Sequence, residues 1–86
     1  MIKKDFTMNS VEGMHLRTGM LLNKLCKKYD CDVNIIFNHN TINVGSVLNI
    51  VAACITKGSK FAITCDGKDE EECMDAITKF SGEYFV

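Results

Sequence analysis

A histidine and an arginine two residues apart are the side chains best suited to chemistry in this chain. His15 and Arg17 stand where a stretch without helical periodicity turns into an amphipathic helical pattern. The N–H groups at the start of a helix lack intrahelical partners, and this end carries partial positive charge, so an anion is stabilised there. The same field favours the neutral, nucleophilic form of an imidazole. These residues predict a histidine that carries a phosphoryl group; the alternative is a histidine that only caps the helix.

Hydrophobic periodicity predicts the elements that must position these residues. Alternating apolar and polar residues indicate strands, and apolar residues three or four apart indicate helices. The predicted strands are Ile2–Met8, Cys31–Phe37, Thr41–Val44 and Lys60–Asp66, and the predicted helices are Leu16–Lys28, Val47–Ala53 and Asp69–Gly82.

Two helices carry detailed expectations. In the first, the apolar spacing assigns Met20, Leu21, Leu25 and Cys26 to the core side. In the last, Asp69 is expected to cap the N-terminus with Glu72 as its capping-box partner, and Gly82 to end the helix. Its predicted buried stripe is Cys73, Met74, Ile77 and Phe80.

The order strand, helix, strand, strand, helix, strand, helix predicts an α+β fold. We expect an open-faced sandwich in which one four-stranded antiparallel sheet is covered on one face by three helices. A chain of 86 residues without a linker is expected to form one domain, residues 1–86.

Composition argues against several classes of protein. Ten basic and eleven acidic residues give a net charge of −1, with no basic tract, which disfavours a nucleic-acid partner. The longest nearly uncharged stretch, Val33–Ile55, contains too many polar residues to span a bilayer. The first residues lack the apolar run of a signal peptide, so a cytoplasmic protein is expected.

The cysteines are odd in number and form no CxxC pair. Their spacing predicts neither a disulfide framework nor a zinc site, so we expect reduced thiols that pack as small apolar residues. No metal and no cofactor are expected. The five positions are Cys26, Cys31, Cys54, Cys65 and Cys73.

The chain resembles the HPr family, the histidine-containing phosphocarriers of the bacterial sugar phosphotransferase system. The stretch Gly13–Arg17 is similar to the family's Gly-aliphatic-His-Ala-Arg motif, and further counterparts are Lys28–Asp30, Val44–Leu48 and the segment from Asp66 to Glu71. The resemblance covers nearly the whole chain without gaps and implies a βαββαβα fold.

The resemblance also implies a reaction. Nδ1 of His15 would accept a phosphoryl group from phosphorylated enzyme I, which is charged by phosphoenolpyruvate, and pass it to the A component of a sugar permease. Arg17 would neutralise the phosphate, helped by the backbone N–H of Leu16 and by Thr18. Such a protein is a phosphoryl carrier rather than a true enzyme, and family members are mostly monomers.

Ser46 and the helix after it have two interpretations each. Ser46 is a natural N-cap residue, and the resemblance implies a regulatory phosphorylation site for HPr kinase/phosphorylase whose product binds a catabolite control protein. Val47, Leu48 and Val51 match the family's docking patch, with core packing as the alternative. At least one of the three is expected to be exposed, because so short a helix cannot bury them all.

Two departures keep other functions open. Thr18 and Gly19 stand where the family usually has proline and alanine, which predicts a looser helix start. A regulatory HPr-like paralogue acting through Ser46 on a kinase or transcription factor is the first alternative. A small module that binds a ligand or RNA through its open sheet is the second, disfavoured by the absence of a basic sheet face.

Overall fold

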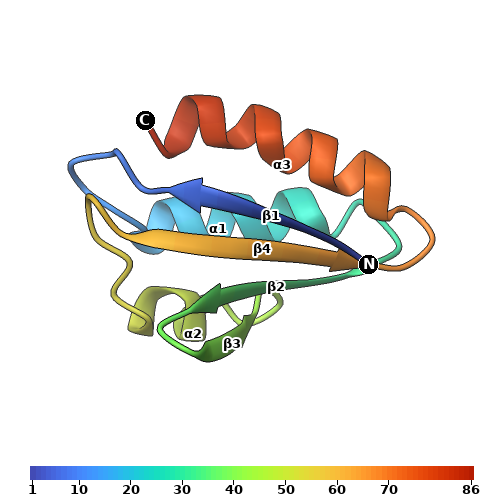
Figure 1. Cartoon of the computed structure of the whole chain (residues 1–86), viewed down its shortest axis with the longest axis horizontal. Helices are drawn as coiled ribbons and strands as arrows, with labels where there is room; N and C mark the ends of the chain where they lie inside the picture. The colour runs from blue at the N-terminus through green and yellow to red at the C-terminus, as the bar shows by residue number, and fades with distance from the viewer.

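The computed structural model describes all residues, 1–86, and has the predicted order of elements (Figure 1). The strands are β1 (Ile2–Thr7), β2 (Asp32–Phe37), β3 (Asn40–Asn43) and β4 (Lys60–Asp66), and the helices are α1 (Leu16–Cys26), α2 (Val47–Ala52) and α3 (Glu70–Tyr84). No helix has the length and apolar character needed to cross a membrane.

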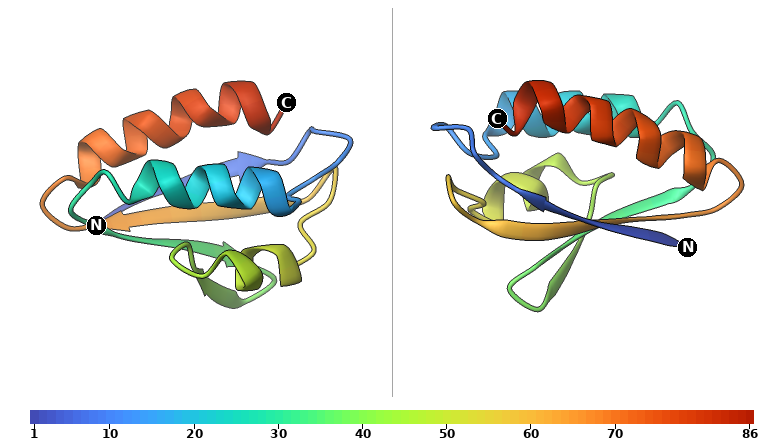
Figure 2. Two further views of the ribbon diagram at one scale, coloured as in Figure 1. Left: turned by 180° about the vertical axis from the view of Figure 1, so that it is seen from behind. Right: turned by 45° about the horizontal axis from the view of Figure 1, so that its top comes forward.

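The four strands form one antiparallel sheet in the order β1-β4-β2-β3, with β1 and β3 at its edges. All three helices lie on the same face of this sheet, and the other face is open (Figure 2). The helices and the covered face enclose a core of 19 buried apolar residues. The predicted α+β open-faced sandwich is therefore confirmed.

The predicted core face of α1 is partly wrong. Met20 is 54% exposed, whereas Leu22, which the sequence pattern did not single out, is fully buried. Leu21 and Leu25 pack at the margin of the core, and Cys26 lies inside it. The reason is that α1 contacts both α2 and α3, so its buried face is centred on Leu22, which belongs to the core shared with the sheet.

The predicted capping of α3 is also wrong in its bonding. Asp69 occupies the N-cap position but makes no side-chain cap bond. Its carboxylate instead accepts a hydrogen bond from the Asp30 N–H at 2.8 Å, while Glu70 accepts one from the Gly67 N–H at 3.2 Å. Glu72 is exposed. The Asp69 carboxylate therefore links the start of α3 to the loop before β2 and does not cap its own helix.

The helix does not end at Gly82 as predicted, and it continues to Tyr84. Phe85 is 2% exposed and packs edge-on against the rings of Phe6, Phe61 and Phe80. Burial of this aromatic residue favours an ordered last turn, which outweighs the tendency of an exposed glycine to end a helix. The predicted stripe of α3 is buried as expected.

Candidate functional site

His15 is the N-cap residue of α1, and its backbone is extended at φ −93° and ψ 178°. The carbonyl of His15 accepts the N–H of Gly19 at 2.9 Å, which is the first backbone bond of the helix. The N–H groups of Leu16, Arg17 and Thr18 precede this bond and lie at the open end of the helix. The ring of His15 therefore stands beside donors that suit an anion.

Both polar contacts of the His15 ring are made by Nε2. Glu12 Oε2 lies 2.9 Å from Nε2, and Thr18 Oγ1 lies 3.0 Å from it. A carboxylate can only accept a hydrogen bond, so the contact with Glu12 favours a proton on Nε2. In the neutral ring Nδ1 then carries the free lone pair, which makes it the nucleophilic nitrogen.

The loop before His15 is held against the segment that follows α2. Gly13 has φ +67°, and a Cβ at this position would lie 2.5 Å from the carbonyl oxygen of Ile55. The next residue, Met14, donates its N–H to that same oxygen at 2.8 Å. Only glycine fits this approach without displacing the backbone, so Gly13 fixes the direction from which the chain enters α1.

The other predicted site residues of α1 differ in their surroundings. Arg17 is exposed and takes part in none of the ion pairs of the structure, so its guanidinium is available to an anion. Thr18 is only 3% exposed, and its hydroxyl faces the His15 ring. Leu16 is 53% exposed.

The short helix α2 packs against α1 one turn beyond His15. A Cβ on Gly19 would lie 3.5 Å from Ile50 and 3.7 Å from Val47, which are ordinary contact distances. Asn23 adds a link between the elements, because its side-chain amide donates to the carbonyl of Val44 at 2.8 Å. The start of α2 is thereby fixed beside α1 at Gly19 and Asn23.

Ser46 occupies the N-cap position of α2, as predicted, but makes no side-chain cap hydrogen bond. After it, Leu48 is 78% exposed, whereas Val47 and Val51 are half-buried. Ile50 is the buried anchor of this helix. The expectation that one of the three apolar residues is exposed is met by Leu48.

Comparison with known proteins identifies the family. Residues 2–82 match the family described as the PTS HPr component phosphorylation site. The chain belongs to the HPr family. It is 25% identical over 83 residues to the phosphocarrier protein HPr of Buchnera aphidicola, covering 96% of this chain and 98% of that one. It is 32% identical over 65 residues to HPr of Mycoplasma capricolum, covering 76% and 73%.

The fold supports the same assignment. The solved structure of a histidine-containing phosphocarrier protein from Mycoplasma has a TM-score of 0.92 and 26% identity, and the match covers 99% of this chain and 98% of that chain. This protein is thus an HPr-type phosphocarrier of the phosphotransferase system, and a connection to sugar transport follows from the family.

The structure adds two features of this HPr domain that sequence reasoning missed. Glu12 lies in the loop before His15, but its contact with His15 depends on the turn at Gly13 and has no sequence signature. Met20 was assigned to the core, yet with Leu16 it forms an exposed apolar strip one turn long on α1. The four-residue spacing of Leu16 and Met20, which places them on one side of a helix, was the available signal for that strip.

Proposed function

We propose that Nδ1 of His15 accepts a phosphoryl group from phosphorylated enzyme I, charged by phosphoenolpyruvate, and donates it to the A component of a sugar permease in the cytoplasm. The observation that carries this proposal is the 2.9 Å contact between Glu12 and Nε2, which directs the free lone pair to Nδ1 at the start of α1. Family membership supports the partners.

The reaction uses residues already in place. The Nδ1 lone pair forms a bond to phosphorus while the bond from phosphorus to the donor protein breaks. The ring becomes positively charged, and its Nε2 proton stays hydrogen-bonded to the Glu12 carboxylate. Arg17 and the N–H groups of Leu16 and Arg17 stabilise the phosphoryl oxygens. Because the protonated ring is a good leaving group, the phosphoryl group is held without being trapped.

Partner recognition is assigned to the docking surface, defined here as Leu16, Met20, Val47, Leu48 and Val51. Leu16, Met20 and Leu48 are each more than half exposed. They belong to the two helices that meet beside His15, so a partner covering them reaches the phosphoryl group as well. Exposed apolar side chains grouped next to a reactive residue are typical of a binding surface.

Regulation through Ser46 is a second proposed role, favoured by one observation. The Ser46 hydroxyl is not used as a helix cap, so its modification breaks no cap bond. A phosphate there, added by HPr kinase/phosphorylase, would add negative charge at the edge of the docking surface. A catabolite control protein would bind this phosphorylated form. The test is an acid-stable phosphate, added by that kinase with ATP, that Ser46→Ala lacks. Labelling elsewhere in the chain contradicts this role.

The decisive experiment uses both histidines of the chain. With enzyme I and phosphoenolpyruvate, the protein is expected to gain one acid-labile phosphate, measured by intact mass. His15→Ala should gain none, and His39→Ala, which changes an exposed residue of the β2–β3 turn, should behave like the original protein. An unchanged mass of the original protein, or labelling that depends on His39, refutes the carrier function.

Arg17→Ala separates a role at the site from a role in folding. Because Arg17 is exposed and unpaired, its loss should leave the melting temperature almost unchanged. Removal of a charged donor from a phosphoryl site is expected to slow transfer about 100-fold. Equal effects on melting temperature and transfer rate would show that Arg17 acts through the fold.

A further inference from the structure

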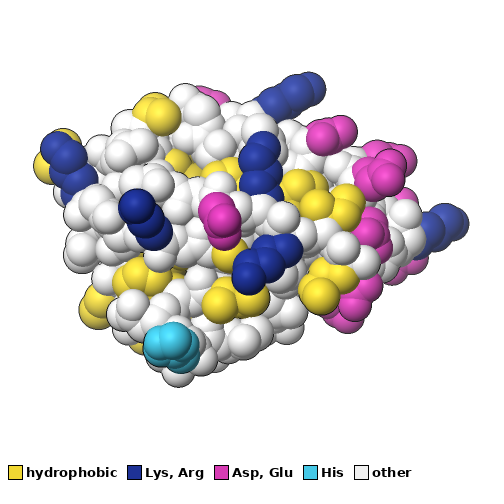
Figure 3. Space-filling view, viewed as in Figure 1, with side chains coloured by type: hydrophobic (Ala, Val, Ile, Leu, Met, Phe, Trp, Pro, Cys, Tyr) yellow, Lys and Arg dark blue, Asp and Glu magenta, His cyan; other side chains and the backbone are white.

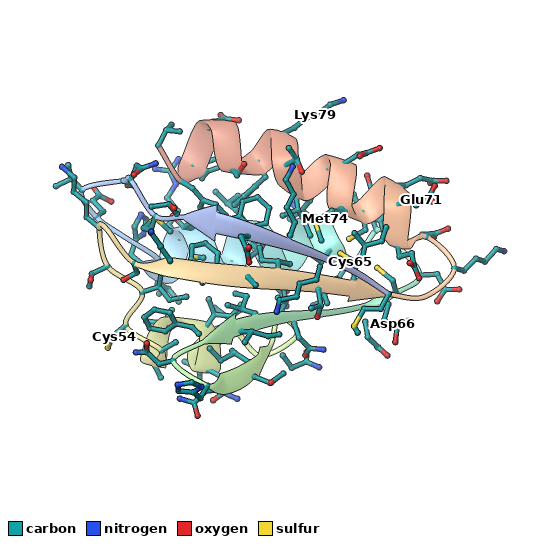
Figure 4. All side chains as sticks on the ribbon, viewed as in Figure 1. Cys54, Cys65, Asp66, Glu71, Met74 and Lys79 are labelled. Atoms are coloured by element: carbon teal, nitrogen blue, oxygen red, sulfur yellow. The ribbon has the colours of Figure 1, made fainter.

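Three cysteines that are far apart in the sequence meet at the end of the molecule opposite His15. Cys31 precedes β2, Cys65 lies near the end of β4, and Cys73 lies in the first turns of α3. Their Sγ atoms all lie within 4.8 Å of one another. In Figure 4 sulfur atoms gather between the end of β4, where Cys65 is labelled, and the first turns of α3.

A fourth thiol adjoins this group. Cys26, the last residue of α1, belongs to the same buried core cluster as Cys65 and Cys73. Cys26, Cys65 and Cys73 are buried, and Cys31 is half-buried. The cysteines come from four different segments, so spacing along the chain gives no motif, whereas the fold assembles a cluster of sulfur donors.

The separation of the sulfur atoms suits one metal ion. Sulfur ligands lie about 2.3 Å from Zn²⁺, which places the sulfur atoms of one site about 4 Å from each other. A triangle with sides of at most 4.8 Å reaches that size by small side-chain rotations. Packing of small apolar side chains alone does not require three thiols to converge on one point.

The backbone around the cluster is fixed by specific contacts. A Cβ on Gly67 would lie 2.6 Å from the Cα of Cys31, so only glycine lets the turn after β4 approach this residue. Asp69 holds the same segment twice, because its carboxylate accepts the N–H of Asp30 at 2.8 Å and its N–H donates to the carbonyl of Asp30 at 3.1 Å. These contacts fix the backbone next to Cys31 and hold it against the start of α3, which carries Cys73.

The half-buried Cys31 borders a surface pocket, and the start of α3 beside the cluster is acidic. Cys26 and Cys31 line a surface pocket of about 160 Å³, which opens beside α1. Acidic side chains gather around the start of α3, where Glu70, Glu71 and Glu72 form the first turn (Figure 3). Negative charge at this end raises the local concentration of cations.

We propose that Cys31, Cys65 and Cys73 bind one thiophilic d¹⁰ metal ion, Cu⁺ or Zn²⁺. Thiolates select these ions over harder cations. Cu⁺ needs only the three sulfur atoms, whereas Zn²⁺ prefers four ligands and recruits Cys26. Each thiol that becomes a ligand releases its proton, so metal binding is accompanied by proton release.

The experiment uses the full chain, reduced and freed of metal. The protein is titrated separately with Zn²⁺ and with Cu⁺ against a chromophoric chelator, and the number of bound ions is checked by native mass spectrometry. One ion per chain is expected. Cys54→Ala is the matched control, because Cys54 is exposed beside α2, far from the cluster (Figure 4).

Cys31→Ala is the principal variant, since it keeps the Cβ that packs near Gly67 and changes only a half-buried thiol. Its metal affinity should fall at least 100-fold, with an unchanged circular dichroism spectrum. Cys26→Ala should weaken Zn²⁺ far more than Cu⁺. The proposal is overturned if Cys31→Ala binds as tightly as Cys54→Ala, or if the folded original chain retains neither ion against the chelator.

Discussion

At the scale of single residues, Glu12 distinguishes the two nitrogens of the His15 ring. The residue types of His15 and Arg17 favoured phosphoryl chemistry over a simple helix cap only when they were combined with the resemblance of the whole chain to the HPr family. The contact of Glu12 was not predictable. It depends on the positive φ of Gly13 and on the close approach of this loop to Ile55, which is a tertiary contact.

Glu12→Gln tests this role. The amide keeps an acceptor for the Nε2 proton but lacks the charge that stabilises the positively charged ring. For a partly exposed pair the loss is about 1 kcal/mol, so phosphoryl uptake is expected to slow about 5-fold. The ¹⁵N spectrum should also show less of the Nε2–H tautomer.

Glu71→Gln is the matched control, because Glu71 is an exposed carboxylate on α3 (Figure 4). It should change neither the transfer rate nor the tautomer. If Glu12→Gln transfers at the original rate, the carboxylate does not stabilise the positively charged ring.

The left-handed backbone conformation of Cys54 lowers the free energy of unfolding. It has φ +57°, directly after the C-cap of α2, where glycine is usually favoured. Cys54→Gly is expected to raise the free energy of unfolding by about 1 kcal/mol, measured by urea denaturation. Cys54→Ala keeps the Cβ and should give no such gain. Equal stability of the two variants would show that the left-handed conformation carries no cost here.

At the scale of elements, periodicity predicted all seven helices and strands but not every contact that they make. The alternation in β4 was clear because Phe61, Ile63 and Cys65 all belong to the core. Helix α1 contacts two other helices, and its core face was shifted away from Met20. The bonds of Asp69 depended on the distant loop of Asp30, and the end of α3 depended on packing of Phe85 against strands β1 and β4. Local propensity is overridden where such tertiary contacts are available.

The two sides of α2 are expected to respond differently to truncation. Ile50→Ala removes a fully buried side chain and should lower the free energy of unfolding by about 2 to 5 kcal/mol. Leu48→Ala removes a side chain that is 78% exposed and should leave stability almost unchanged while slowing transfer between partners. Urea denaturation and phosphotransfer rates measured on both variants check this. A Leu48→Ala protein that transfers at the original rate excludes Leu48 from the docking surface.

At the scale of the whole molecule, the thiol cluster makes the free energy of unfolding vary with pH in the alkaline range. Burial raises the pKa of Cys65 and of Cys73 from 9.0 to about 11. Above pH 9 the unfolded chain loses these protons while the folded chain keeps them, so the unfolded state is favoured as pH rises. The stabilising contribution is complete below pH 9 and is lost between about pH 9 and 11.

The free energy of unfolding in reducing, metal-free buffer should therefore fall above pH 9, by about 1 kcal/mol per pH unit for each buried thiol. Urea denaturation at pH 7, 9 and 10.5 measures this. Cys65→Ala should show a shallower fall, and Cys54→Ala should follow the original chain. Identical slopes for Cys65→Ala and Cys54→Ala would contradict the raised pKa.

Because the Met14 N–H donates a hydrogen bond to the carbonyl of Ile55, hydrogen exchange of this one amide reports how often the loop beside His15 opens. Met14 is 4% exposed, so its amide exchanges with deuterated water only when the loop before α1 separates from the segment after α2. The exchange rate counts those openings without altering any reactive group. A partner that binds α2 and slows this exchange would reduce how often the loop before His15 opens, in addition to covering the residue.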